Sequence, residues 1–75
     1  DQDAQYVALL DAYGGFPPEL TPGMTKLGRL VCANLGTGVT RQDVYFALYG
    51  SGSSIYSSED VAAIMQSAET VYCPQ

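Results

Sequence analysis

The chain has 75 residues, of which 47% are hydrophobic and only 15% charged, and its formal net charge is −5. The hydrophobic content excludes a disordered chain, and the length predicts a single domain. The negative charge disfavours contact with phosphate backbones and with anionic membrane surfaces. No apolar run approaches the roughly 20 residues that cross a bilayer. We therefore expect no nucleic acid partner and no membrane span.

Residues 3–13 are predicted to form the first helix, because their apolar side chains recur at the i, i+3, i+4 and i+7 spacing of a buried face. These side chains are Tyr6, Leu9, Leu10 and Tyr13. The glycine pair at 14–15 follows at the position of a left-handed helix stop. The proline pair at 17–18 cannot continue a helix and predicts a stiff connector, with Phe16 and Leu20 pointing inward.

The second predicted helix begins near Thr21-Pro22, a cap followed by proline at the first helical position, and ends at Gly36. Its apolar face consists of Met24, Leu27, Val31 and Leu35, flanked by Leu30 and Cys32. Gly28 lies in the middle of this helix, where glycine costs about 1 kcal/mol relative to alanine. We expect this glycine to let another helix approach closely.

Two capping patterns predict the starts of the third and fourth helices. The segments 40–43 and 57–60 each place a hydroxyl three residues before an aspartate, as in a capping box, with apolar residues on both sides. The predicted buried stripes are Val44, Ala47 and Leu48 in the third helix, and Val61, Ile64, Met65, Ala68, Val71 and Tyr72 in the fourth. The glycine- and serine-rich segment 50–54 lacks the lysine of a phosphate-binding loop, so we expect a flexible linker.

The two cysteines, Cys32 and Cys73, have 40 residues between them in a chain without histidine. Metal sites usually need histidine or several thiolates, and redox pairs usually lie close in sequence. A structural disulfide is therefore favoured over these two alternatives. Disulfides persist in oxidising compartments, which predicts a secreted or cell-envelope protein. We expect the chain to be the mature part of a precursor whose signal peptide is removed.

The expected fold is all-α: residues 1–75 form one compact bundle of four short helices, packed orthogonally and stapled by one disulfide. Bonded cysteines have Cα atoms within about 7 Å, so the C-terminal ends of the second and fourth helices should meet. These two helices are then roughly parallel, with the third beside them and the first packed across the group.

Motifs along the chain also carry a family resemblance. The run Leu27–Gly36 resembles the pattern LG..VC..L..G, the segment Asp43–Leu48 has the pattern DV..AL, and Ala68–Pro74 has the pattern A...YCP. Tyr6 to Gly14 matches an opening FL..L...G pattern loosely. In this order the motifs resemble a secreted actinobacterial, largely mycobacterial, family known as domain of unknown function 732. The resemblance implies an exported helical domain with Cys32 bonded to Cys73, and it brings no catalytic residues.

No catalytic, metal or cofactor site is predicted. Without histidine the chain cannot form a Ser-His-Asp or Cys-His arrangement. The adjacent carboxylates Glu59 and Asp60 lie in the first turn of a helix, where acidic side chains favour the helix dipole. No loop with calcium-binding spacing occurs. We expect a protein that is not an enzyme and needs no cofactor.

The aromatic residues suggest where a partner would bind. Tyr6, Tyr13 and Tyr72 lie on apolar stripes and are expected in the core, with their hydroxyls at its edge. Phe46 lies off the stripe of the third helix, so it is either covered by a loop or exposed on a contact surface. The candidate partner surface consists of Phe46, Tyr49 and Gln42.

Two functions follow from this reading. The first is an interaction module, a monomer, that contacts an unknown protein or cell-envelope component through its aromatic surface. The alternative is a carrier of a small apolar ligand such as a lipid, in which the flexible side chains of Met24 and Met65 would shape the pocket.

Overall fold

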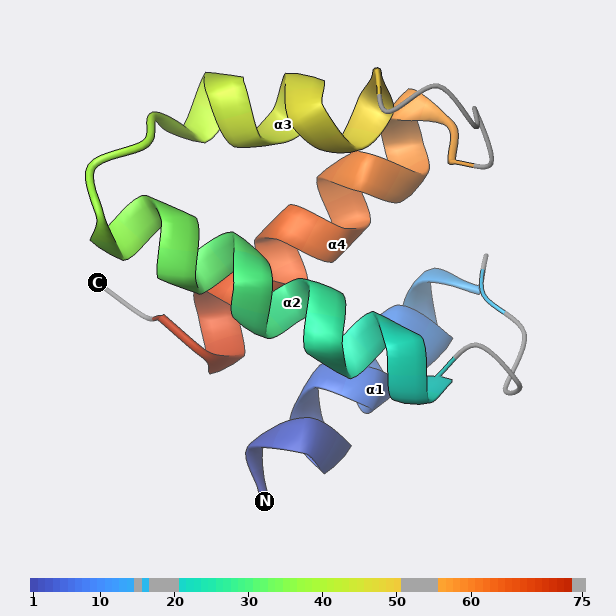
Figure 1. Cartoon of the computed structure of the whole chain (residues 1–75). Helices are drawn as coiled ribbons and strands as arrows, with labels where there is room; N and C mark the ends of the chain where they lie inside the picture. Colours follow the sequence, from blue (N-terminus) through green and yellow to red (C-terminus); the bar gives the residue numbers. More distant parts are fainter. Residues whose placement is uncertain (15, 17–20, 51–55, 74–75) are drawn as a thin grey trace.

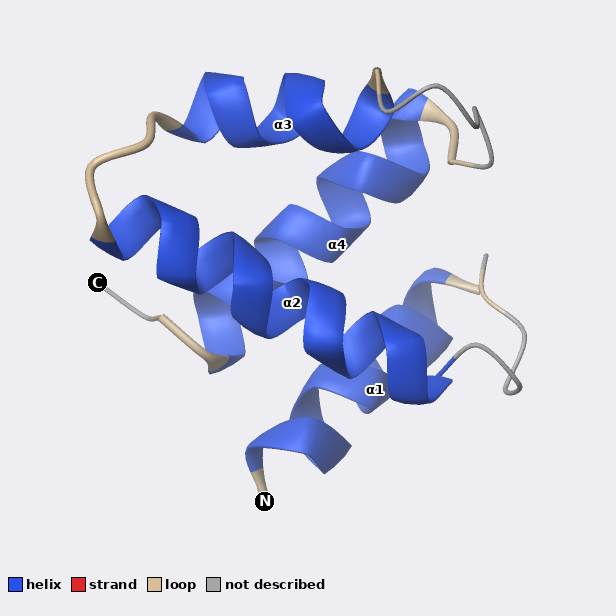
Figure 2. Cartoon of the chain, viewed as in Figure 1, coloured by secondary structure: helices blue, strands red, loops and turns tan. Residues whose placement is uncertain are grey.

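A computed structural model of the chain describes residues 1–14, 16, 21–50 and 56–73. The four helices are α1 (Gln2–Tyr13), α2 (Thr21–Gly36), α3 (Arg41–Tyr49) and α4 (Ser58–Val71). The described ranges contain no strand (Figure 2). The predicted all-α fold and helix boundaries are thereby confirmed. The proline connector and the centre of the glycine- and serine-rich linker lie outside the described residues.

The helix ends follow the capping signals in the sequence. The Thr40 hydroxyl accepts a hydrogen bond from the Asp43 amide at 3.1 Å and starts α3. At α4 the Ser57 hydroxyl accepts from the Asp60 amide, and the Asp60 carboxylate accepts from the Ser57 amide, which completes the capping box. Gly14 ends α1 in the left-handed region at φ 87° and donates its amide to the Leu10 carbonyl.

The helix α4 lies at the centre of the packing and contacts the other three helices. Figure 1 shows α2 across the middle, with α3 on one side, α1 on the other and α4 passing behind. Within the described residues α1 and α3 make no contact with one another. The buried apolar residues are Tyr6 and Leu10 from α1, Met24 and Val31 from α2, Val44 from α3, and Val61, Ile64, Met65, Ala68 and Val71 from α4.

The close approach expected at Gly28 is made by the ring of Tyr6 on α1. A Cβ atom on Gly28 would lie 2.7 Å from Cζ of Tyr6, so no other residue fits there without movement. Tyr6 is fully buried, and its ring centroid lies 5.0 Å from that of Tyr72. Its hydroxyl has no hydrogen-bond partner among the described residues. Burial first, and then the nearby hydroxyls of Tyr72 and Tyr56, raises the pKa of Tyr6.

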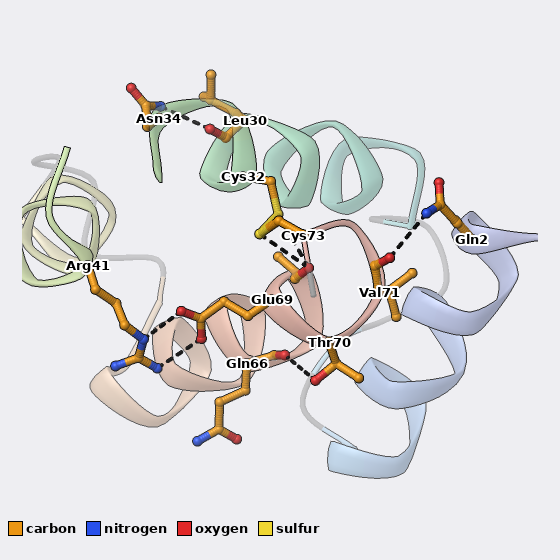
Figure 3. Close-up of a disulfide and its surroundings, with 11 residues drawn as sticks. Gln2, Leu30, Cys32, Asn34, Arg41, Gln66, Glu69, Thr70, Val71 and Cys73 are labelled. Atoms are coloured by element: carbon orange, nitrogen blue, oxygen red, sulfur yellow. Dashed lines mark hydrogen bonds and ion pairs between the residues drawn. A yellow bond between two sulfur atoms is a disulfide. The ribbon is translucent and has the colours of Figure 1, made fainter. Parts of the chain in front are cut away.

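The disulfide joins Cys32 and Cys73 with a Cα–Cα distance of 5.6 Å, which confirms the predicted bond. Cys32 lies one turn before the end of α2, and Cys73 lies directly after α4. Both sulfur atoms lie against the carbonyl oxygen of Ala68, at 3.3 and 3.9 Å (Figure 3). The C-terminal ends of α2 and α4 therefore meet, as the topology required.

A polar cluster on the surface ties the start of α1 to α2 and α4. The Asp3 carboxylate accepts hydrogen bonds from the Tyr72 hydroxyl and the Arg29 guanidinium, both at 2.6 Å. The Arg29 guanidinium also lies 5.3 Å from the centre of the Tyr72 ring. The hydrogen bond from Tyr72, and then that from Arg29, lowers the pKa of Asp3. The Asp3 carboxylate of α1 thus binds one side chain from α2 and one from the end of α4.

The prediction that four side chains of α1 are buried is wrong for two of them. Leu9 and Tyr13 are exposed, because α1 packs only against α2 and α4 and its covered face is narrower than the periodicity predicted. The Tyr13 hydroxyl donates to the Asp60 carboxylate at 3.0 Å instead. The expectation that core hydroxyls lie at the edge is also wrong for Tyr6. Phe16 is half-buried against the core, as predicted.

Candidate functional site

A groove of about 240 Å³ lies between α2 and α3. Its α2 wall is formed by Leu27, Leu30, Val31 and Asn34, and its α3 wall by Asp43, Val44, Ala47 and Leu48, with Val39 of the preceding loop at one end. Seven of these nine side chains are apolar. A concave surface that is mostly apolar and has few polar groups is the usual form of a binding site in proteins.

The groove lies where a short turn joins α2 to α3 and where a small side chain, Ala47, faces α2. Gly38 adopts φ 96° in this turn, a conformation that glycine reaches without strain. The Val39 amide donates to the Asn34 carbonyl at 3.1 Å, which fixes Val39 at the end of the groove. Ala47 contributes a single methyl group to the α3 wall, so the space opposite α2 stays open.

Apolar side chains at the rim of the groove remain in water. Leu30 is 56% exposed and Val39 is 37% exposed, although both line the groove. The sequence placed Leu30 at the flank of a buried stripe and Val39 in a hydrophobic staple. A leucine or valine that becomes fully buried on binding contributes about 1.5–3 kcal/mol relative to the exposed state. The rim therefore offers apolar surface to an incoming group.

The two polar side chains of the groove differ in what they can still bind. The Asn34 amide already donates to the Leu30 carbonyl at 2.9 Å within α2. The Asp43 carboxylate forms no ion pair with any described residue, since Arg29 pairs with Asp3 and Arg41 pairs with Glu69. The groove thus presents one negative charge on an otherwise apolar wall.

The aromatic face of α3, formed by Gln42, Tyr45, Phe46 and Tyr49, lies on the other side of this helix from the groove. Phe46 is 56% exposed and Tyr49 is 47% exposed, so the alternative that Phe46 is buried does not hold. Tyr45 is half-buried and supports both rings, with centroid distances of 5.7 Å to Phe46 and 6.0 Å to Tyr49. Gln42 is exposed one turn before Phe46. The three predicted partner-surface residues therefore share one exposed face.

The methionines proposed to shape a ligand pocket lie elsewhere. Met24 and Met65 are buried in the core, and neither lines the groove. The Met24 sulfur also accepts a hydrogen bond from the Tyr56 hydroxyl at 3.6 Å, so this side chain is held within the core. An apolar ligand in this protein would therefore contact leucine and valine rather than methionine.

The adjacent carboxylates Glu59 and Asp60 lie at the start of α4. Asp60 accepts from the Ser57 amide and from the Tyr13 hydroxyl, and Glu59 accepts from the Ser58 hydroxyl. Across the described ranges, no three acidic or cysteine side chains come close enough together to hold a metal ion. The described helices are also too short or too polar to cross a membrane.

The sequence identified the aromatic face but missed the groove. A helical period reveals which residues of one helix share a face, whereas a groove depends on the distance between two helices. One available signal was Ala47, a small residue between two larger ones in a predicted buried stripe. The prediction that Ala47 is buried is wrong, because its side chain lines the open groove and is exposed. Placing it opposite Leu27 and Val31 required the tertiary structure.

These features define a small all-α domain, closed by one disulfide, with an apolar groove and an exposed aromatic face. The chain belongs to the family described as protein of unknown function (DUF732), whose model matches residues 1–75. This match confirms the family that the motifs around Gly28, Val44 and Cys73 resemble. No curated protein and no solved structure matches the chain.

Proposed function

We propose that this protein is an exported, non-enzymatic interaction module that binds a protein or a cell-envelope component through the aromatic face of α3. The observation that carries the proposal is the exposure of two large rings, Phe46 and Tyr49, side by side on a helix of nine residues. Aromatic side chains dominate the binding energy of many protein interfaces. A fold that leaves two of them in water favours a binding role for this face.

The packing of Tyr45 supports this role. Because Tyr45 contacts both exposed rings, Phe46 and Tyr49 are restrained before any partner arrives. A restrained side chain loses less conformational entropy on binding than a free one. Tyrosine also combines an apolar ring with a polar hydroxyl, which suits a surface that is wet in the free protein and dry in a complex.

The disulfide supports export, because thiols are kept reduced in the cytoplasm of most organisms. Cys32 and Cys73 are both half-buried, and their bond closes a domain whose core is small. The partner would then be met outside the cytoplasm, in the medium or in the cell envelope.

Replacement of Phe46 by serine tests the proposal. The variant and the wild type are immobilised and used to capture components from culture filtrate and envelope extract of the producing organism. We expect Phe46→Ser to weaken capture about 30-fold, the effect of losing one interface hot spot of about 2 kcal/mol. Circular dichroism should show an unchanged fold, since Phe46 is more than half exposed.

Leu9→Ser is the matched control, because Leu9 is also a large exposed apolar residue but lies on α1, which does not contact α3 in the described structure. This control should capture as much as the wild type. Equal capture by Phe46→Ser and the wild type would contradict the proposal, as would equal losses in both variants.

A second candidate function, the carriage of a small apolar ligand, is favoured by the groove itself. Its volume of about 240 Å³ is below the roughly 300–1,000 Å³ of most small-molecule sites. The groove therefore suits part of a ligand better than a whole lipid. A titration with oleate tests this candidate, and Ala47→Leu should abolish oleate binding because Ala47 lines the groove.

A further inference from the structure

The groove between α2 and α3 is separate from the aromatic face. Its walls come from two helices, and its rim residues Leu30 and Val39 are exposed. Phe46 and Tyr49 project from the other side of α3 and do not line it. Occupancy of the groove and contact at the aromatic face can therefore be measured independently.

The size of the groove restricts its occupant. A volume of about 240 Å³ is smaller than the usual site for a complete small molecule. An amphipathic helix binds in such a groove by inserting side chains spaced at i, i+3 and i+4. The space lined by Leu27, Val31 and Ala47 is therefore suited to one or two apolar side chains of a partner protein.

The charge of the site restricts the occupant further. Asp43 lines the groove, and no described cation pairs with it. The whole chain carries a net charge of −5, and two of its three cations, Arg29 and Arg41, are held by carboxylates. This field attracts a cationic partner and repels an anionic one, which includes a second copy of this chain and a fatty acid.

Building on the proposed role as a binding module, we propose that the groove binds a basic amphipathic segment of a partner protein. One or two apolar side chains of that segment insert between Leu30 and Ala47. A lysine or arginine of the segment pairs with the Asp43 carboxylate. Asp43 then has two roles, since its amide also donates to the Thr40 hydroxyl that caps α3.

The test uses two fluorescein-labelled helical peptides with leucine at the i, i+3 and i+4 positions. One carries lysine at its polar positions and the other carries glutamate. Fluorescence anisotropy at physiological ionic strength measures their binding to the full chain. We expect the lysine peptide to bind and the glutamate peptide not to bind.

Variants locate the bound peptide. Ala47→Leu should abolish binding because it fills the groove, and it should fold, because Ala47 is exposed and leucine is a good helix former. Asp43→Asn should weaken binding about fivefold, the upper end for an accessible ion pair. Asp11→Asn is the matched control, since Asp11 is an exposed carboxylate on α1 and its loss changes the net charge equally. It should leave binding unchanged.

Several outcomes would overturn the proposal. Equal weakening by Asp43→Asn and Asp11→Asn would show attraction by net charge alone, and wild-type binding by Ala47→Leu would place the peptide outside the groove. Loss of binding in Phe46→Ser alone would move the peptide to the aromatic face, which refutes the groove proposal but keeps the proposed function. Tighter binding of oleate than of the lysine peptide, abolished by Ala47→Leu, would assign the groove to a lipid.

Discussion

The two sides of the molecule are held together in different ways. On one side α1, α2 and α4 share a disulfide, the Tyr6–Gly28 contact and nine of the ten buried apolar residues. On the other side α3 contributes only Val44 to the core. Most of the stabilising interactions are thus concentrated away from α3. This helix is left free to present apolar side chains on two faces.

The N-terminal end of α3 carries a cap and an ion pair with α4. The Thr40 cap starts it, and Arg41 forms two hydrogen bonds with the Glu69 carboxylate on α4, at 2.6 and 3.0 Å (Figure 3). An ion pair with this much solvent exposure contributes little, at most about 1 kcal/mol. The attachment of α3 therefore depends mainly on apolar contacts, which are made by the buried Val44 and the half-buried Tyr45 and Leu48.

The largest expected effect on stability comes from removing the disulfide, which joins α2 to the end of α4. Replacing both Cys32 and Cys73 by serine should lower the free energy of unfolding by about 4 kcal/mol, because the bond closes a loop with a sequence separation of 41. Urea unfolding followed by circular dichroism measures the change. Wild type kept in reductant should unfold at the same urea concentration as the double variant. An unchanged midpoint in both samples would show that the bond adds nothing to stability.

The next effect concerns the contact between α1 and α2. Gly28→Ala should destabilise the protein by about 1–2 kcal/mol, because overpacking against the Tyr6 ring exceeds the gain in helix propensity. Gly23→Ala is the control on the same helix, since a Cβ atom there meets nothing within 4 Å. This control should stabilise the protein by about 0.5–1 kcal/mol. If thermal denaturation shows both variants stabilised, the close approach of Tyr6 is not maintained in solution.

The smallest effect is the pH dependence that Asp3 confers. Because Tyr72 and Arg29 lower the pKa of Asp3 below its ordinary value of 3.8, the unfolded chain binds a proton at Asp3 more readily than the folded chain does. The stabilisation is therefore present above about pH 4 and is lost as the pH falls below it. Asp3→Asn should make the acid limb of a plot of Tm against pH shallower. Asp11→Asn should not, and equal slopes in wild type and Asp3→Asn would refute the assignment.

The sequence predicted most of the stronger side. The cap at Ser57, the stop at Gly14 and the close approach at Gly28 depend on local chemistry or on glycine itself. Pairing of the cysteines followed from their number. The predicted disulfide then required the C-terminal ends of α2 and α4 to lie together, as they do in the structure.

The sequence-based predictions fail where the burial of a side chain depends on contacts with other helices or loops. Leu9 and Tyr13 satisfied the helical period but face water, since α3 packs too far from α1 to cover them. Phe46 was left with two alternatives, because one helix cannot show whether a loop will cover it. The groove at Ala47 and the free charge of Asp43 depend on the spacing of α2 and α3, which no local pattern encodes.

The bond between Cys32 and Cys73 also makes part of the chain a closed covalent ring that contains α3 and α4, with α1 outside it. A protease that cleaves once anywhere within this ring leaves a single molecule, whose two pieces separate only after reduction. The helix α3 is therefore retained after a single cut in either of its flanking loops. In the exported protein proposed above, that topology would preserve the attachment of α3 even when the backbone is broken.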